Sequence, residues 1–226
     1  VPLLAVEPLD PQRDAELCAT ADGLLQQLDG YDAVIVISIN AVAMGLVRAA
    51  QYWPQWPPQP RWYAIGTATA EALRQWGIDA IAPAQGMYSE ALLAQPELQQ
   101  MHGHRVLIIR GIGGRETLAT HLRERGAIVD YAECYRRVEP ILDDAARAAL
   151  ARPVDAICVN SAETLTNLWN NLSARDQSRV CRQALVVPSQ RVGDQAAALG
   201  FQHVIVAANA GTPATLAALA TLTKRQ

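Results

Sequence analysis

The chain repeats itself, and this repeat limits its possible folds more than any other feature. When the sequence is slid by 123 residues, residues 32–38 fall on residues 155–161. The same offset places residues 62–66 on residues 185–189 without a gap. One offset therefore aligns two separate apolar runs and also the serine that follows the first run. Such a match indicates two similar structural modules.

Short runs rich in β-branched residues alternate with longer Ala- and Leu-rich runs. The short runs predict strands buried on both faces, because their apolar character is almost continuous; they lie at 33–37, 62–65, 106–109, 128–131, 156–159, 185–187 and 204–206. Several of the longer runs predict helices that stop at a glycine, the residue expected just past a helix C-terminus: Gly77, Gly126 and Gly200. Repeated strand–helix units predict an α/β fold with two flavodoxin-like or Rossmann-like domains, each built on a parallel sheet.

A Val-Glu-Pro motif occurs at residues 6–8 and again at residues 138–140. Each copy ends a predicted strand where one module should pass the chain to the other. If the two segments pair, they form a two-stranded β-ladder hinge, and modules joined by so little backbone should move relative to each other. We therefore expect a continuous domain at 10–133 and a discontinuous domain of 1–9 plus 134–226, with a ligand bound in the cleft between them.

The second copy of this motif follows a complete strand–helix–strand unit at 106–131. The first copy has no such unit before it in the sequence. The repeat therefore predicts a further strand–helix unit upstream of Val1.

Composition excludes several classes of protein. Of the 226 residues, 50% are hydrophobic and 18% are charged, which is too apolar for a disordered chain. The formal charge of −3 lacks the basic surplus typical of nucleic-acid binding. The longest apolar runs fall well short of the ~20 residues that a membrane helix needs. We expect neither nucleic acid nor a membrane as a partner.

The cysteines and histidines give no sign of a cofactor. Cys18, Cys134, Cys158 and Cys181 are scattered without a CxxC pair, which favours reduced thiols in a cytoplasmic protein. The four histidines show no spacing typical of metal ligands. We therefore expect no metal and no cofactor.

Candidate binding residues lie in the loops that follow strands. Ligands of open parallel sheets bind beyond the carboxyl ends of the strands. Each of these loops leads into a helix whose first N–H groups are free, and together with a hydroxyl group, a glycine or a cation they can bind an anion. The candidates are Ser38, Asn40, Thr67, Arg110, Gly111, Gly113, Gly114, Arg115, Ser161 and Ser189. The alternative is that the hydroxyl residues only cap helices.

The glycine-rich segment 110–115, Arg-Gly-Ile-Gly-Gly-Arg, matches neither GxGxxG nor the phosphate loop of nucleotide-binding proteins. Its glycines allow a ligand to approach the backbone, and its two arginines suit carboxylates as well as phosphates. Tyr135 stands just before the second Val-Glu-Pro motif, in a position expected to line the cleft. A phenol there can donate a proton to a leaving oxygen. The alternative is a ring that only packs against the linker.

At these residues the chain resembles the uroporphyrinogen-III synthase family. The resemblance is carried by Ser-Ile-Asn-Ala-Val at 38–42, Tyr-Ala-Ile-Gly-Thr-Ala-Thr-Ala at 63–70, the run Leu-Ile-Ile-Arg-Gly-Ile-Gly-Gly-Arg-Glu-Thr-Leu at 107–118, and Cys-Tyr-Arg-Arg at 134–137. The order and spacing of these motifs match across nearly the whole chain. The family's opening strand, with its Thr-Arg-Pro-like loop, has no match in the sequence.

The resemblance implies two α/β domains with the active site between them. It implies a cofactor-independent hydro-lyase of heme and tetrapyrrole biosynthesis that cyclises hydroxymethylbilane with inversion of ring D and loss of water. Tyr135 would be the catalytic acid, and the substrate's many carboxylates suit the proposed helix N-termini. We expect a monomer. A two-lobed small-anion-binding or sensor protein without catalysis is the alternative, and a nucleotide-binding α/β protein is a third.

Overall fold

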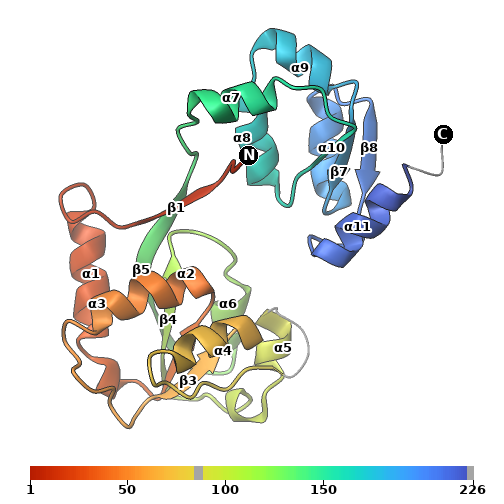
Figure 1. Cartoon of the computed structure of the whole chain (residues 1–226). Helices are drawn as coiled ribbons and strands as arrows, with labels where there is room; N and C mark the ends of the chain where they lie inside the picture. The colour runs from red at the N-terminus through yellow and green to blue at the C-terminus, as the bar shows by residue number, and fades with distance from the viewer. Residues whose placement is uncertain (84–88, 223–226) are drawn as a thin grey trace. The chain divides into compact units, whose positions relative to one another are not determined.

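The computed structural model describes residues 1–83 and 89–222, which belong to two compact units (Figure 1). The larger unit is Val6–Arg137, and the smaller unit combines Val1–Ala5 with Val138–Gln226. The chain changes units next to residue 5 and next to residue 138, whereas the sequence placed these changes near residues 10 and 133. Both units are α/β with parallel strands, as the alternating pattern predicts. Within the described residues, no helix is long and apolar enough to cross a membrane.

A five-stranded sheet with the order β1-β5-β4-β2-β3 forms the centre of the larger unit. Its strands are β1 (Ala5–Pro8), β2 (Ala33–Val36), β3 (Arg61–Ala64), β4 (Arg105–Gly111) and β5 (Ile128–Val138). β4 pairs in parallel with both β2 and β5, and β2 pairs in parallel with β3. The strands predicted at 33–37, 62–65 and 106–109 are therefore confirmed to within two residues at each end.

Successive residues of β2 point into two different apolar layers. Val34 and Val36 pack with helices on one face, and Ala33 and Ile35 pack with helices on the other. The first layer includes α1 (Ala15–Leu25), α2 (Ile39–Ala41), α3 (Val47–Ala49) and α4 (Thr67–Arg74), and the second includes α5 (Ser89–Leu93) and α6 (Thr117–Glu124). Because helices cover both faces, the strands are apolar at nearly every position. Short 3₁₀ turns lie at Leu28–Gly30 and Pro96–Leu98.

The helix after β2 has a π-helical centre. The segment η2 (Val42–Leu46) separates α2 from α3. Gly45 in this segment faces the sheet so closely that a Cβ would lie 2.4 Å from Cγ2 of Ile109 in β4. The glycine lets the helix approach β4 and β5, and this approach holds the start of α2 near the ends of both strands.

The smaller unit contains a three-stranded parallel sheet, β6-β7-β8. Its elements are α7 (Asp144–Leu150), β6 (Ala156–Cys158), α8 (Ala162–Asn170), α9 (Ala174–Val180), β7 (Ala184–Val187), α10 (Gln190–Ala198), β8 (His203–Val206) and α11 (Thr212–Ala220). One apolar cluster joins the sheet to α8, α9 and α10, and a smaller cluster joins it to α11. The pairing of Ala33 with Arg61 recurs 123 residues later as Ala156 with Ala184, so the repeat in the sequence is also a repeat in the strand register.

Candidate active site

An irregularity in the pairing of β5 with β4 determines which way the Tyr135 side chain points. The sequence predicts a strand at 128–131 and a hinge strand that ends at the second Val-Glu-Pro motif, with Tyr135 just before that motif. In the structure these two are one strand, β5, which continues to Val138. In the register with β4, Arg110 pairs with Glu133 but Gly111 pairs with Tyr135, which leaves Cys134 as the extra residue of a β-bulge. A bulge changes which way the following side chains point. As a result, Cys134 and Tyr135 are both buried in the same apolar layer, the one that contains α2 and α3.

The hydroxyl of Tyr135 is within hydrogen-bond distance of the Ser38 hydroxyl. Its Oη lies 2.9 Å from Ser38 Oγ. Ser38 is the N-cap of α2, and its Oγ also accepts a hydrogen bond from the N–H of Ala41 at 2.9 Å. The Tyr135 side chain is largely enclosed, since the residue is only 7% exposed. A Cβ on Gly111 would lie 2.4 Å from Cε2 of the tyrosine ring, so the ring rests directly against the glycine backbone.

Arg110 holds the glycine-rich loop from inside. It is the next-to-last residue of β4 and is only 2% exposed. Its guanidinium donates from Nε to the carbonyl of Gly111 at 3.1 Å, from Nη1 to Glu116 Oε1 at 2.9 Å, and from Nη2 to the carbonyl of Gly113. It also lies over the ring of Tyr131, 4.6 Å from the centroid. These contacts occupy the guanidinium within its own loop.

The rest of the loop is exposed to solvent, and its backbone conformation requires glycine at two positions. Gly113 and Gly114 have φ values of +70° and +99°, a region that other residues rarely adopt. Both glycines and Arg115 are exposed. The N–H of Gly113, one of the predicted anion-binding groups, donates to Oε1 of Glu133 at 3.4 Å. This contact, which places a carboxylate of the protein itself on the loop, could not be predicted from the sequence.

Tyr131 and Glu116 complete the support of this loop. The hydroxyl of Tyr131 donates to Oε2 of Glu116. This hydrogen bond, together with those from Arg110, lowers the pKa of the Glu116 carboxyl. Burial, and then the neighbouring Glu116 carboxylate, raise the pKa of Tyr131. Near neutral pH the tyrosine therefore stays protonated and the glutamate stays ionised, as the hydrogen bond and the ion pair with Arg110 require.

Replacing Arg110 with methionine should free the loop without removing any exposed cation. Methionine fills part of the same space but leaves the carbonyls of Gly111 and Gly113 without their donor. We expect unfolding to need about 1–3 kcal/mol less free energy, the range for losing hydrogen bonds to a charged group. We also expect a higher KM for the substrate, because the backbone of a loop expected to bind it is no longer held in one conformation.

Chemical denaturation and steady-state kinetics of Arg110→Met check this expectation. Arg74→Met is the matched control, since Arg74 is an exposed arginine of α4 whose partner, Glu71, is also exposed. The control should leave both the unfolding midpoint and KM unchanged. An unchanged KM in Arg110→Met would show that the loop does not need this anchor.

The remaining candidates occupy helix starts in separate loops. Asn40 and Thr67 are exposed in the first turns of α2 and α4. Ser161 caps α8, with Oγ accepting from the N–H of Thr164 at 3.0 Å. Ser189 is the N-cap residue of α10, and its side chain makes no cap hydrogen bond. Of the predicted site residues, the structure therefore brings Ser38, Gly111 and Tyr135 together, and Arg110 supports the adjoining loop.

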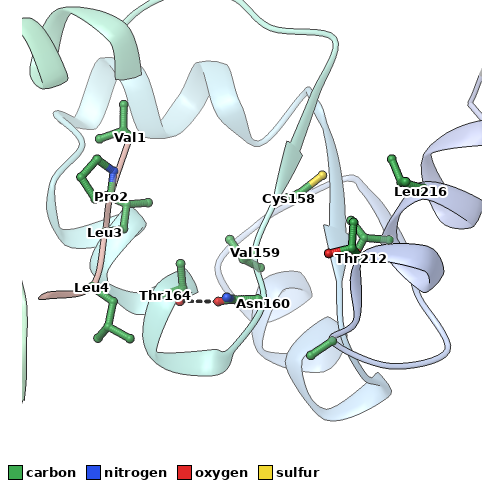
Figure 2. A pocket seen from close by; sticks show the side chains of 12 residues that line it. Val1, Pro2, Leu3, Leu4, Cys158, Val159, Asn160, Thr164, Thr212 and Leu216 are labelled. Carbon is green, nitrogen blue, oxygen red and sulfur yellow. Dashed lines mark hydrogen bonds between the residues drawn. The ribbon is translucent and has the colours of Figure 1, made fainter. Parts of the chain in front are cut away.

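A pocket of about 470 Å³ lies in the smaller unit (Figure 2). Its walls include Asn160 and Thr164, which follow β6, and Thr212 and Leu216 from α11; the segment Val1, Pro2, Leu3 and Leu4 also lines it. Thr164 Oγ1 donates to Oδ1 of Asn160 at 2.9 Å. The volume is within the usual range for small-molecule sites. The loop of Asn160 and Ser161 was among the loops expected to bind a ligand, but Thr164 and Thr212 were missed, although Thr212 precedes a proline at the start of a helix, a pattern typical of helix N-termini.

The cysteines offer no nucleophile beside Tyr135. Burial raises the pKa of Cys134 to about 12, so this neighbouring residue is a neutral thiol near neutral pH.

Within residues 1–83 and 89–222, no group of three or more His, Cys, Asp and Glu side chains is arranged to hold a metal ion. The groups that the structure brings together at Tyr135 are its phenol, the hydroxyl of Ser38 and the backbone of Gly111.

Comparison with known proteins identifies the family. The family model for uroporphyrinogen-III synthase HemD matches residues 1–217. The chain belongs to the uroporphyrinogen-III synthase family. The uroporphyrinogen-III synthase of Salmonella typhimurium is 40% identical over 208 residues, which cover 90% of this chain and 84% of that protein. The synthase of Escherichia coli is 39% identical over 201 residues, covering 86% and 81% respectively.

Solved synthase structures share the fold. The uroporphyrinogen-III synthetase of Helicobacter pylori superposes with a TM-score of 0.62 at 15% identity, over 97% of this chain and 91% of that one. A mutant synthase of Thermus thermophilus gives a TM-score of 0.57 at 18% identity, over 100% and 88%. At these identities the likeness concerns the mixed α/β architecture.

Proposed function

We propose that this chain is a uroporphyrinogen-III synthase, a cyclising lyase that converts hydroxymethylbilane to uroporphyrinogen III with inversion of ring D and loss of water. The observation that carries the assignment is the placing of the Tyr135 hydroxyl against Ser38, inside a chain whose family match spans residues 1–217. A sensor without chemistry has no need for a phenol held in this way, and the family comparison does not favour that alternative.

The reaction begins when the hydroxyl group on ring A leaves as water. Tyr135 donates its proton to the leaving oxygen as the C–O bond breaks, and the bond's electron pair departs with that oxygen. The resulting azafulvenium cation is attacked by ring D through its substituted carbon, which gives a spiro intermediate. This intermediate breaks and recloses with ring D turned over, and the free ring carbon that closes the macrocycle loses a proton. That proton restores the phenol, so the acid is regenerated without a cofactor.

The enzyme must also hold a flexible, highly charged substrate in one folded shape. We propose that helix N-termini bind its carboxylates through free N–H groups. The proposed groups are at Asn40, Thr67, the loop of Gly113, Gly114 and Arg115, Ser161, Ser189 and the pocket residue Thr212. Positioning of this kind can supply a large part of the rate enhancement for an intramolecular cyclisation.

We further propose that β1 and β5 form the hinge expected from the sequence. These strands are neighbours in the sheet, and the N–H of Leu9 donates to the carbonyl of Cys134 at 3.2 Å. They also contain both places where the chain changes units. Any movement of this ladder would act directly on β5, the strand that carries Tyr135.

Incubation with hydroxymethylbilane tests the proposed function. Separation of the products by HPLC should show uroporphyrinogen III in excess. A protein-free reaction run in parallel gives the spontaneous product, uroporphyrinogen I. If the protein binds the substrate but yields only isomer I, the chain is a binding protein rather than a synthase.

A further inference from the structure

Ser38 was expected from the sequence to bind substrate directly, but its contacts point to a different role. We infer that Ser38 is a positioning residue whose hydroxyl donates a hydrogen bond to Tyr135 Oη, so that the phenol's own proton remains available for the leaving group. This inference rests on the proposed function, because it assigns a task to Ser38 within that same reaction.

Either oxygen can be the donor in this hydrogen bond, and the proton that the reaction needs from Tyr135 favours Ser38 as the donor. Ser38 Oγ has one O–H to donate and can accept two hydrogen bonds. It already accepts from the N–H of Ala41, at 2.9 Å. Tyr135 Oη, at 2.9 Å, is the acceptor that the described structure places within reach of the serine proton. If Tyr135 donated instead, its proton would be held by the serine and withheld from the substrate.

The same contact assists the proton transfer itself. When Tyr135 gives up its proton, negative charge develops on Oη, and a hydrogen bond to an ionised oxygen is stronger than one to a neutral oxygen. Ser38 cannot easily turn away, because the backbone of α2 holds its Oγ through Ala41. The close approach of the helix at Gly45 keeps α2 against β4 and β5. The helix cap thus becomes a fixed donor aimed at the catalytic oxygen, which is the preorganised arrangement that favours charge development.

A double-mutant cycle separates positioning from simple helix capping. Ser38→Ala should lower kcat by about 10- to 100-fold, the range expected for one hydrogen bond to a charged group, with little change in KM. In the Tyr135→Phe background the same replacement should change kcat by less than about 3-fold, because the oxygen that it serves is gone. Ser38→Thr, which keeps a hydroxyl and can still cap α2, should restore most of the rate.

Two further variants separate loss of the hydroxyl from loss of the cap. Ser173→Ala removes an equivalent cap hydrogen bond from α9, where Oγ accepts from the N–H of Asp176 at 3.2 Å, and should leave kcat unchanged. Ser38→Gly removes the hydroxyl but is a tolerated N-cap residue, so it covers the case in which Ser38→Ala folds poorly. It should lose as much kcat as the alanine variant.

Equal losses from Ser38→Ala in the presence and absence of the Tyr135 hydroxyl would overturn the inference while leaving the synthase assignment intact. Failure of the unmodified chain to form isomer III would instead overturn the proposed function, and this inference with it. The two failures are therefore distinguished by the same HPLC assay.

Discussion

Tyr135→Phe should lower kcat for isomer III formation by about 10²- to 10⁴-fold, the usual contribution of a positioned general acid. Phenylalanine keeps the ring against Gly111 and fills the same buried space, so the fold should persist. The hydrogen bond to Ser38 is lost, at a cost to folding of about 0.5–1.5 kcal/mol. KM should change little, since most of the proposed carboxylate-binding groups lie elsewhere. Isomer-resolved HPLC under single-turnover conditions measures the chemical step directly.

Tyr31→Phe provides the matched control. Tyr31 is also buried, 1% exposed, and its hydroxyl donates to Asp130 Oδ2 at 2.9 Å. Loss of that hydroxyl should lower the free energy of unfolding by about 1.5–3 kcal/mol, at least as much as in Tyr135→Phe, because the lost hydrogen bond is to a carboxylate. It should leave kcat unchanged. Turnover by Tyr135→Phe within a few-fold of the unmodified chain, measured beside this control, would rule out Tyr135 as the acid.

The position of Tyr135 shows which part of the site could not be predicted from the sequence. The sequence correctly identified the strands, because parallel strands covered on both faces are apolar at nearly every position. After residue 131 that signal disappears, since Glu133, Arg136 and Arg137 interrupt the apolar pattern. β5 nevertheless continues, with β4 on one side and β1 on the other. The repeated Val-Glu-Pro motif suggested that residues 6–8 and 138–140 pair, but nothing in the local sequence shows the bulge at Cys134, which depends on the register with β4.

The surroundings of Arg110 are a second feature that the sequence does not show. The sequence indicates Arg110 and Arg115 as cations that act through ligand binding or through loop order. In the structure Arg110 is buried, because two loop carbonyls, Glu116 and the Tyr131 ring surround its guanidinium. Burial of arginine is tolerated when its donors are matched in this way. The sequence contains those partners but does not show that they meet.

Polar helices were also missed. No helix was predicted at 144–150 or 174–180, where the structure has α7 and α9. Both are short, and few of their side chains are buried, so the apolar periodicity that indicates a helix is weak. Their N-caps, Asp143 and Ser173, were present as local signals, since each side chain accepts a hydrogen bond from the N–H three residues later. For these two helices the capping residues are therefore a clearer sequence signal than hydrophobicity.

Gly111→Ala should remove most of the activity although it adds only one methyl group. The new Cβ would lie 2.4 Å from Cε2 and 2.7 Å from both Cδ2 and Cζ of the Tyr135 ring. The ring is nearly enclosed, so it has no free space to move into without giving up its contact with Ser38. We expect kcat to approach that of Tyr135→Phe, because the acid is displaced rather than deleted. Overpacking should also lower the free energy of unfolding by about 1–3 kcal/mol.

Gly23→Ala shows what the same substitution does where space is available. Gly23 lies in α1, and a Cβ there would meet no atom within 4 Å. This control should keep full activity and gain about 0.5–1 kcal/mol of stability, because alanine is the better helix former. The unfolding temperatures of the two variants should shift in opposite directions, and isomer-resolved kinetics should show a loss of activity in Gly111→Ala alone. If Gly111→Ala kept both its unfolding temperature and its yield of isomer III, the tyrosine ring would have to be free to move, and a rigid, glycine-backed acid could not be the basis of catalysis.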